Sequence, residues 1–169
     1  MQLILYYAPN ACSLVPYVTL TEAGAPFEVH PLNFRKSQHM TPEYLRLNPK
    51  HKVPVLVIDG APLTENVAIQ IWIARHFPAA KLLPEYPMQE LHAISLLAWC
   101  ASGIHPFLSR INSPPRVCDL PGAEESVRRL AQQQLHGAFR ADAAASQRAK
   151  IARLRAGGAD RVRPGRLIC

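Results

Sequence analysis

The sequence predicts a small mixed α/β domain followed by an all-helical unit. Three observations carry this prediction. Residues 1–78 alternate short apolar strands with amphipathic helices, the pair Asp59-Gly60 marks a hairpin turn, and residues 88–139 show helical patterns without a strand pattern. The proline-punctuated stretch 79–87 reads as a linker between the two domains.

The first strand is expected at residues 3–7, where apolar and β-favouring side chains follow one another. The turn Ala8-Pro9-Asn10 leads into a helix over about 13–23, and Gly24 is a suitable residue to end it. A second strand follows at 27–32. These elements form a βαβ unit.

Thr41-Pro42 combines a good N-cap with the residue best tolerated at the first helical position, so a short helix is expected from there to residue 47. Residues 55–58 and 61–63 form the two strands of the hairpin. A helix over 65–76 should close this domain.

Phe77-Pro78 ends that helix because proline cannot continue the hydrogen-bond ladder. Beyond the linker, two longer helices are expected at about 88–107 and 121–139. They define a second, helical domain at 88–139.

The net charge of +7 is concentrated at the C-terminal end. Residues 1–139 carry 11 Lys/Arg against 10 Asp/Glu, whereas residues 140–169 carry 8 against 2. Residues 140–169 therefore form a basic tail of doubtful structure, in which residues 141–155 could form a basic helix on propensity. The Ala, Arg, Gly and Pro content of this tail favours a truncated or frame-shifted product. The alternative is an interaction tail for anionic surfaces or nucleic acid, and a nucleic-acid partner for the whole chain is not expected.

Neither a membrane span nor a secretory signal is expected, because no apolar run approaches the roughly 20 residues needed to cross a bilayer. A cytoplasmic location is the default expectation.

The four cysteines and the acidic residues show no metal-binding pattern. Cys12, Cys100, Cys118 and Cys169 have no CxxC spacing, and no His/Cys/Asp/Glu group has metal-ligand spacing. Metal binding is therefore not predicted, and any cysteine chemistry should be that of a single thiol.

Cys12 lies just before a predicted helix, where free N–H groups and the helix dipole stabilise an anion. We expect this position to lower the pKa of the thiol from about 8.5, which would allow a thiolate at neutral pH. The alternative is a small structural side chain. Tyr6 and Tyr7 point to opposite faces of an alternating strand, so at most one can reach a ligand near Cys12.

The segment 52–74 combines a Val-Pro step into a strand with a polar helix start, Thr64-Glu65-Asn66. A strand-entry backbone near free helix N–H groups could hold a small extended peptide that carries carboxylates. The alternative is ordinary capping of the helix by Thr64, with Glu65 favouring the dipole.

Four motifs resemble the glutathione transferase family, most closely its bacterial beta class. They are YYAPNACSLVPYV, KVPVLVIDG, LTENVAIQIWIARHFP and ASGIHPFLS, which follow one another at compatible spacing over residues 1 to about 139. The resemblance implies a thioredoxin-like N-terminal domain of order βαβαββα and an all-α C-terminal domain. That second domain is expected to be incomplete here.

The resemblance also implies catalytic residues. Cys12 matches the cysteine that lies beside the glutathione sulfur and can form a mixed disulfide with it, and Ser13 follows as a hydroxyl donor. Tyr7 is the competing activator, by analogy with classes that use a tyrosine. His105 matches the histidine that faces the ligand sulfur, where it would polarise the thiol or orient a water.

For the peptide itself, the resemblance implies that Pro54 is preceded by a cis bond and that the Val53 backbone pairs with the cysteinyl part of glutathione. Glu65 would hold the γ-glutamyl ammonium and Asn66 its carboxylate. Lys36 and Lys52 are the expected partners of the glycyl carboxylate, chosen from a set that includes Arg35 and Lys50.

The expected function is a glutathione transferase of the detoxification type. It would activate the thiol of its co-substrate glutathione for attack on an electrophilic small molecule or a disulfide, and the fold implies a homodimer. The alternatives are a glutathione-binding or inactive remnant without turnover and, more distantly, a basic-tailed binding protein.

Overall fold

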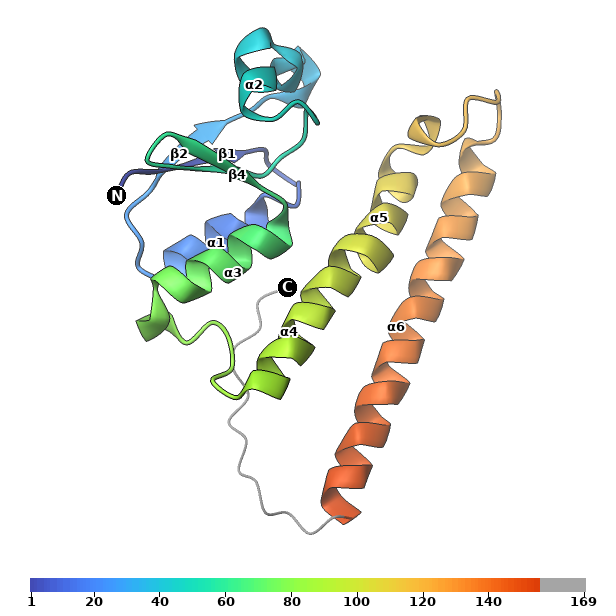
Figure 1. Cartoon of the computed structure of the whole chain (residues 1–169). Helices are drawn as coiled ribbons and strands as arrows, with labels where there is room; N and C mark the ends of the chain where they lie inside the picture. The colour runs from blue at the N-terminus through green and yellow to red at the C-terminus, as the bar shows by residue number, and fades with distance from the viewer. Residues whose placement is uncertain (156–169) are drawn as a thin grey trace. The chain divides into compact units, whose positions relative to one another are not determined.

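The computed structural model describes residues 1–155, and for residues 145 and 148–155 it describes the backbone alone. The chain divides into two compact units, one formed by Met1–Leu97 and one that begins at Ala98 (Figure 1). The sequence had placed a domain end at residue 78 and a linker at 79–87. Each unit is described by itself.

A four-stranded mixed sheet forms the centre of the first unit. Its strands are β1 (Leu3–Tyr7), β2 (Glu28–Pro31), β3 (Val55–Ile58) and β4 (Ala61–Thr64). Their order is β2-β1-β3-β4; β1 runs parallel to β2, and the other pairs are antiparallel. The predicted hairpin is present, with φ of 47° at Asp59 and 87° at Gly60, as a tight two-residue turn requires.

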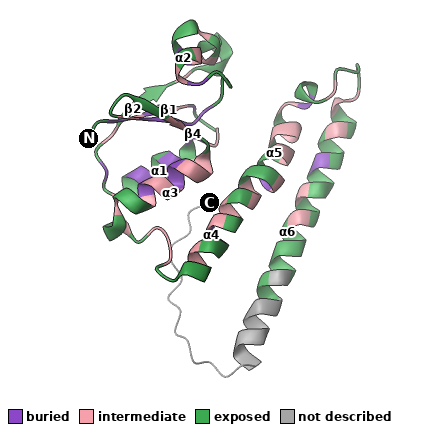
Figure 2. Cartoon of the chain, viewed as in Figure 1, coloured by how far each residue is buried: buried purple, intermediate pink, exposed green. Residues whose placement is uncertain are grey.

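Two helices, α1 (Leu14–Glu22) and α3 (Asn66–His76), pack together against one face of this sheet (Figure 1). The helices bury residues of the face they turn to the sheet (Figure 2). The core there contains Leu3, Ala25 and five side chains with no exposed surface, Leu5, Leu20, Leu56, Ile69 and Ile73. Leu5 and Leu56 are register partners on β1 and β3, so they point to the same side. The predicted thioredoxin-like α/β fold is confirmed.

The other face of the sheet is covered near α2 (Pro42–Leu47) by a second apolar cluster. Its buried members are Ala8, Tyr44, Val53, Val55 and Val57. Thr41 caps α2 as predicted, its hydroxyl accepting the Tyr44 N–H at 3.4 Å. Two single 3-10 turns, η1 (Phe34–Lys36) and η2 (Gln38–Met40), precede α2.

Beyond α3, the 3-10 turn η3 (Pro78–Ala80) leads to α4 (Pro87–Trp99). A π-helical turn, η4 (Cys100–Ile104), joins α4 to α5 (His105–Asn112). After the turn η5 (Pro114–Arg116), α6 runs from Glu124 to Arg155 and packs along α5, where the Arg128 guanidinium donates to the Ile111 carbonyl at 3.1 Å.

The helical region departs from the sequence prediction in two places. The expected helix 88–107 is interrupted because Pro106 has no N–H to continue the ladder and because the Trp99 ring lies against Gly103. The helix expected to end near residue 139 continues to Arg155, since residues 141–147 are rich in good helix formers. The change in composition at residue 140 is therefore not a helix end, and residues 156–169 of the predicted tail lie outside the described part.

By length and composition alone, the helical segment Pro87–Asn112 is long and apolar enough to cross a membrane. This corrects the expectation that no stretch of the chain approaches that length. A core helix of a soluble protein passes the same test, so this finding alone does not indicate a membrane protein.

Candidate functional site

The loop after β1 places Cys12 beside the start of α1. Ser13, the residue before α1, is fully buried, and its hydroxyl accepts the Ala8 N–H at 3.0 Å and donates to the Ala8 carbonyl at 3.1 Å. These two bonds close the loop. The Ser13 hydroxyl, expected to donate to a ligand, is therefore engaged with the backbone.

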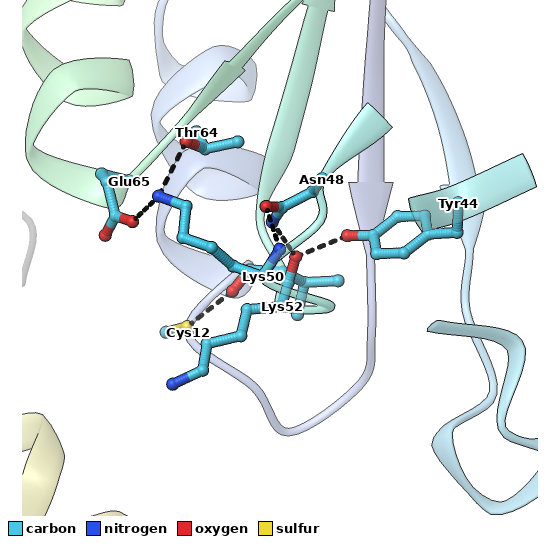
Figure 3. A network of polar contacts seen from close by, with 8 residues as sticks. Cys12, Tyr44, Asn48, Lys50, Lys52, Thr64 and Glu65 are labelled. Carbon is cyan, nitrogen blue, oxygen red and sulfur yellow. Dashed lines mark hydrogen bonds and ion pairs between the residues drawn. The ribbon is translucent and has the colours of Figure 1, made fainter. Parts of the chain in front are cut away.

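Cys12 joins three segments of the first unit. Its thiol donates to the Val53 carbonyl at 3.2 Å, the contact drawn from the Cys12 sulfur in Figure 3. The Cys12 carbonyl accepts the Asn66 side-chain amide at 3.0 Å. The loop after β1, the strand-entry segment and the first residue of α3 thus meet at one point.

The expectation of a lowered pKa at Cys12 is wrong. Partial burial raises the pKa of the Cys12 thiol and the Glu65 carboxylate adds to the increase, while hydrogen bonds from its own backbone and from Asn66, together with the Lys52 ammonium, oppose it. Position along the sequence suggested an anion near a helix start, but the thiol is half-buried and donates to a carbonyl. The resting form is therefore the neutral thiol.

Val53 presents its main chain at this point. The Val53–Pro54 peptide bond is cis, as the resemblance implied. The Val53 carbonyl accepts the Cys12 thiol, whereas no hydrogen bond to the Val53 N–H is found among residues 1–155. A main-chain N–H without a partner is uncommon in a protein interior, so this group is a candidate donor to a ligand.

Glu65 and Asn66 begin α3, and Glu65 itself is the N-cap, with φ of 73° and no side-chain capping bond. Thr64 is the last residue of β4, so the alternative of capping by Thr64 is wrong. The first helical bond of α3 joins the Ile69 N–H to the Glu65 carbonyl, which leaves the N–H groups of the first turn without helical partners. Free N–H groups at a helix start can bind an anion.

The side chains of these two residues are already engaged. Glu65 forms an ion pair with Lys50, whose ammonium also donates to the Thr64 hydroxyl at 3.3 Å (Figure 3). The Asn66 amide donates to the Cys12 carbonyl, and its Oδ1 atom is buried without a partner in the described structure. The Asn66 donor that we expected to hold a ligand carboxylate is thus used within the protein.

Among the basic candidates, Lys50 forms an exposed ion pair with Glu65 in the ligand-free protein. Lys52 lies near enough to Cys12 for its ammonium to favour the thiolate. Lys36 is the last residue of η1. Their roles toward a ligand stay predictions.

Tyr6 and Tyr7 point to opposite faces of β1, as predicted. Tyr6 packs against Tyr44, with ring centroids 5.6 Å apart, whereas Tyr7 packs against Tyr17 at 5.5 Å on the α1 side. The contacts of Tyr7 are therefore separate from those of Cys12. His105 is the first residue of α5 in the second unit, and its role also stays a prediction.

Sequence reasoning missed two residues of α2 and its end that hold the strand-entry segment. The Tyr44 hydroxyl and the Asn48 side-chain amide both donate to the Lys52 carbonyl, at 2.6 and 2.8 Å. Burial raises the pKa of Tyr44 to about 12. The sequence YLRLN offered one indication of this pair. Tyr44 and Asn48 are four residues apart, a spacing that places two residues on the same face of a helix.

Metal chemistry finds no support in the part of the chain that is described. No group of three or more His, Cys, Asp or Glu side chains there could hold a metal ion. The site consists instead of one thiol, one unpartnered backbone donor, one ion pair and a helix start. Such a set suits a small extended ligand with charged ends.

Comparison with known proteins gives a consistent assignment. A family model described as the N-terminal domain of glutathione S-transferase matches residues 1–75. The chain is 36% identical over 104 residues to the glutathione S-transferase GstA of Escherichia coli O157:H7, covering 60% of this chain and 52% of that protein. It is 34% identical over 106 residues to the maleylacetoacetate isomerase of Mus musculus, covering 61% and 49%. The chain spans about half the length of these curated relatives.

Solved structures agree. A glutathione transferase from Methylococcus capsulatus is 30% identical, with a TM-score of 0.68 over 92% of this chain and 71% of that chain. A beta-class transferase from Sphingomonas chungbukensis is 29% identical, with a TM-score of 0.69 over 82% and 67%. A sphingomonad glutathione S-transferase in complex with glutathione is also 29% identical, with a TM-score of 0.68 over 82% and 67%.

Proposed function

Because this chain belongs to the glutathione S-transferase family, we propose that it binds glutathione and activates the thiol of that tripeptide for attack on an electrophilic small molecule. The family match covers β1 to α3, which carry Cys12, Val53 and Asn66. The chemistry of the site supports the same ligand.

The observation that carries the proposal is the unpartnered Val53 N–H beside the Cys12 thiol. An extended peptide pairs with such an edge through one carbonyl and one N–H. The cysteinyl carbonyl of glutathione accepts the Val53 N–H, and the cysteinyl N–H replaces the Cys12 thiol at the Val53 carbonyl. This exchange releases the Cys12 thiol next to the ligand sulfur.

The two ends of the tripeptide carry charges that the site can match. Glu65, which pairs with Lys50 in the ligand-free protein, would exchange that partner for the γ-glutamyl ammonium. The free N–H groups in the first turn of α3 suit the γ-glutamyl carboxylate. Lys52, with Lys36 as the second candidate, supplies the cation for the glycyl carboxylate. Asn66 contributes by holding the Cys12 loop against α3.

In the reaction, the docked glutathione thiol loses its proton to solvent and its sulfur attacks an electrophilic carbon. The new S–C bond forms as the leaving group departs with its electron pair. The positive end of α3 and the Cys12 thiol, acting as a hydrogen-bond donor, lower the pKa of the ligand thiol. Polarisation of the thiol by His105 is expected from the family resemblance alone.

A second candidate is glutathione-dependent isomerisation, favoured by the similarity to a maleylacetoacetate isomerase. There, the glutathione thiolate adds to a conjugated double bond, the carbon–carbon bond rotates, and elimination restores the thiol. Glutathione is regenerated, whereas a transferase consumes it. The beta-class assignment is a further part of our proposal, supported by Cys12 and by the similarity to a beta-class structure. A homodimer is proposed from the family resemblance alone.

Calorimetric titration of the purified chain with glutathione tests the binding step. The matched control is glutathione methylated on its cysteinyl nitrogen, which cannot donate to the Val53 carbonyl. We expect saturable binding of glutathione and much weaker binding of the methylated analogue. Equal affinity for the two peptides would contradict docking at Val53.

Turnover is tested with 1-chloro-2,4-dinitrobenzene and with maleylacetone, while free thiol is counted in each reaction. Loss of one thiol per aromatic product supports the transferase. Conversion of maleylacetone at constant thiol supports the isomerase. Binding without either reaction identifies a glutathione-binding protein, and the absence of binding overturns the proposal.

A further inference from the structure

The carbonyl of Lys52 is held by two buried side chains that the proposed chemistry does not use. Tyr44 donates its hydroxyl at 2.6 Å and Asn48 its side-chain amide at 2.8 Å (Figure 3). Tyr44 is 3% exposed and Asn48 is 2% exposed. The Asn48 Oδ1 atom also accepts the Lys50 N–H at 3.1 Å, so Asn48 closes the whole turn from residue 48 to residue 52.

The Lys52 carbonyl and the Val53 N–H belong to one planar peptide unit. The cis bond in this segment is the next one, Val53–Pro54, so the Lys52–Val53 unit is trans. In a trans unit the N–H points away from the carbonyl. Two donors on the carbonyl therefore fix the plane of the unit and aim the Val53 N–H away from α2.

Hydrogen bonds to a carbonyl also polarise the peptide unit and strengthen its N–H as a donor. Tyr44 stays a donor over the whole neutral range, because burial raises the pKa of its hydroxyl to about 12. The Val53 N–H has no partner among residues 1–155, so the effect of both donors is directed at a group that a ligand can use.

We propose that Tyr44 and Asn48 are positioning residues that orient the Val53 N–H toward the cysteinyl carbonyl of the bound peptide. This inference rests on the proposed function, since it concerns how the same site receives glutathione. Neither residue touches the ligand. Both act through the Lys52 carbonyl.

Tyr44→Phe tests the inference because it removes one donor and keeps the ring. We expect the Kd for glutathione to rise about five- to tenfold, the loss typical of one hydrogen bond. KM should rise with kcat nearly unchanged, since the Val53 N–H holds the peptide equally in the ground state and the transition state. Tyr6→Phe is the matched control. The Tyr6 ring packs at a tilt against Tyr44 and makes no described bond to Lys52, so the Kd of this variant for glutathione should equal that of the wild type.

Two ligands separate positioning from general damage to the fold. γ-Glutamylcysteamine lacks the cysteinyl carbonyl and cannot accept the Val53 N–H. We expect Tyr44→Phe to raise the Kd for glutathione and to leave the Kd for γ-glutamylcysteamine unchanged. An equal loss of affinity for both ligands would show that Tyr44 has a merely structural role, and it would overturn the inference.

A second variant and a spectroscopic signal keep the test decisive if Tyr44→Phe folds poorly. Asn48→Asp keeps the acceptor for the Lys50 N–H and removes the donor to Lys52, so it should give the same ligand pattern. In ligand-free protein, either variant should shift the amide proton of Val53 upfield, because its peptide unit is less polarised. An unchanged Val53 signal would overturn the inference, while wild-type protein that binds no glutathione would overturn the proposed function instead.

Discussion

The two units of the molecule differ in how their helices are supported. In the first unit, α1 and α3 bury their apolar residues against a sheet, and five large side chains there have no exposed surface. In the described part of the second unit, α5 and α6 pack mainly on each other, and large apolar residues such as Leu120, Leu130 and Phe139 stay exposed (Figure 2).

This difference explains why the residues of the candidate site are held in fixed positions. Cys12, Val53 and Asn66 lie on loops and a helix start that the packed sheet holds in place, and buried polar groups such as Ser13 and Asn48 fix those loops. A site built on such a support stays in register when side chains at the surface change. We therefore expect substitutions in the first unit to have larger effects than matched ones in the second.

The largest contrast should come from leucine truncation. Leu56→Ala removes a fully buried side chain between the sheet and α1/α3, and we expect it to lower the free energy of unfolding by about 2–5 kcal/mol. Leu130→Ala changes a side chain that is 52% exposed and should cost less than about 0.5 kcal/mol. Urea denaturation followed by circular dichroism measures both, and similar losses would contradict the comparison.

Two glycines test the packing inside the second unit. A Cβ at Gly103 would lie 2.8 Å from the Trp99 ring, so Gly103→Ala should destabilise this unit by about 1–3 kcal/mol and alter Trp99 fluorescence. Gly137 has nothing within 4 Å of the same position, so Gly137→Ala should stabilise α6 by about 0.5–1 kcal/mol. A Gly103→Ala variant as stable as Gly137→Ala would show that the π-helical turn is not closely packed.

Tyr44 should give the first unit a specific alkaline sensitivity. Because burial raises its pKa from 10.0 to about 12, the neutral phenol is favoured in the folded state. Its contribution to stability is complete below pH 10 and is lost as the pH rises to about 12, by up to about 3 kcal/mol. The difference in unfolding free energy between wild type and Tyr44→Phe should shrink over that range, and a constant difference would exclude this linkage.

The smallest effects concern the charge around Cys12. Alkylation of Cys12 by iodoacetamide, followed by site-resolved mass spectrometry, should reach its midpoint above the pH typical of a free thiol, since burial raises the pKa of Cys12. Glu65→Gln should lower that midpoint and Lys52→Gln should raise it, because the two charges act in opposite directions. Shifts of one sign for both variants would refute this electrostatic assignment.

Local signals in the sequence were enough to predict most of the first unit. Thr41-Pro42 starts α2, Asp59-Gly60 forms the hairpin turn, and the alternation in β1 sends Tyr6 and Tyr7 to opposite faces. Each of these features depends on residues that are close in the chain. The meeting of Cys12, Val53 and Asn66 followed from the family resemblance together with this element order.

The features that the sequence did not predict depend on contacts between distant residues. The pKa of Cys12 depends on burial and on the Val53 carbonyl, 41 residues away. The commitment of Lys50 to Glu65 and of Tyr44 to the Lys52 carbonyl requires the folded turn. The π-helical turn arises from the ring of Trp99 against Gly103 together with Pro106, which no single propensity indicates.

The central claim is that an extended peptide thiol docks on the backbone at Val53 in the first unit. Titration of ¹⁵N-labelled protein with glutathione, followed by amide chemical shifts, tests it most directly. We expect a saturable downfield shift and slower hydrogen exchange at Val53, with smaller shifts at Cys12 and Asn66. An unchanged Val53 amide at saturating glutathione would contradict it.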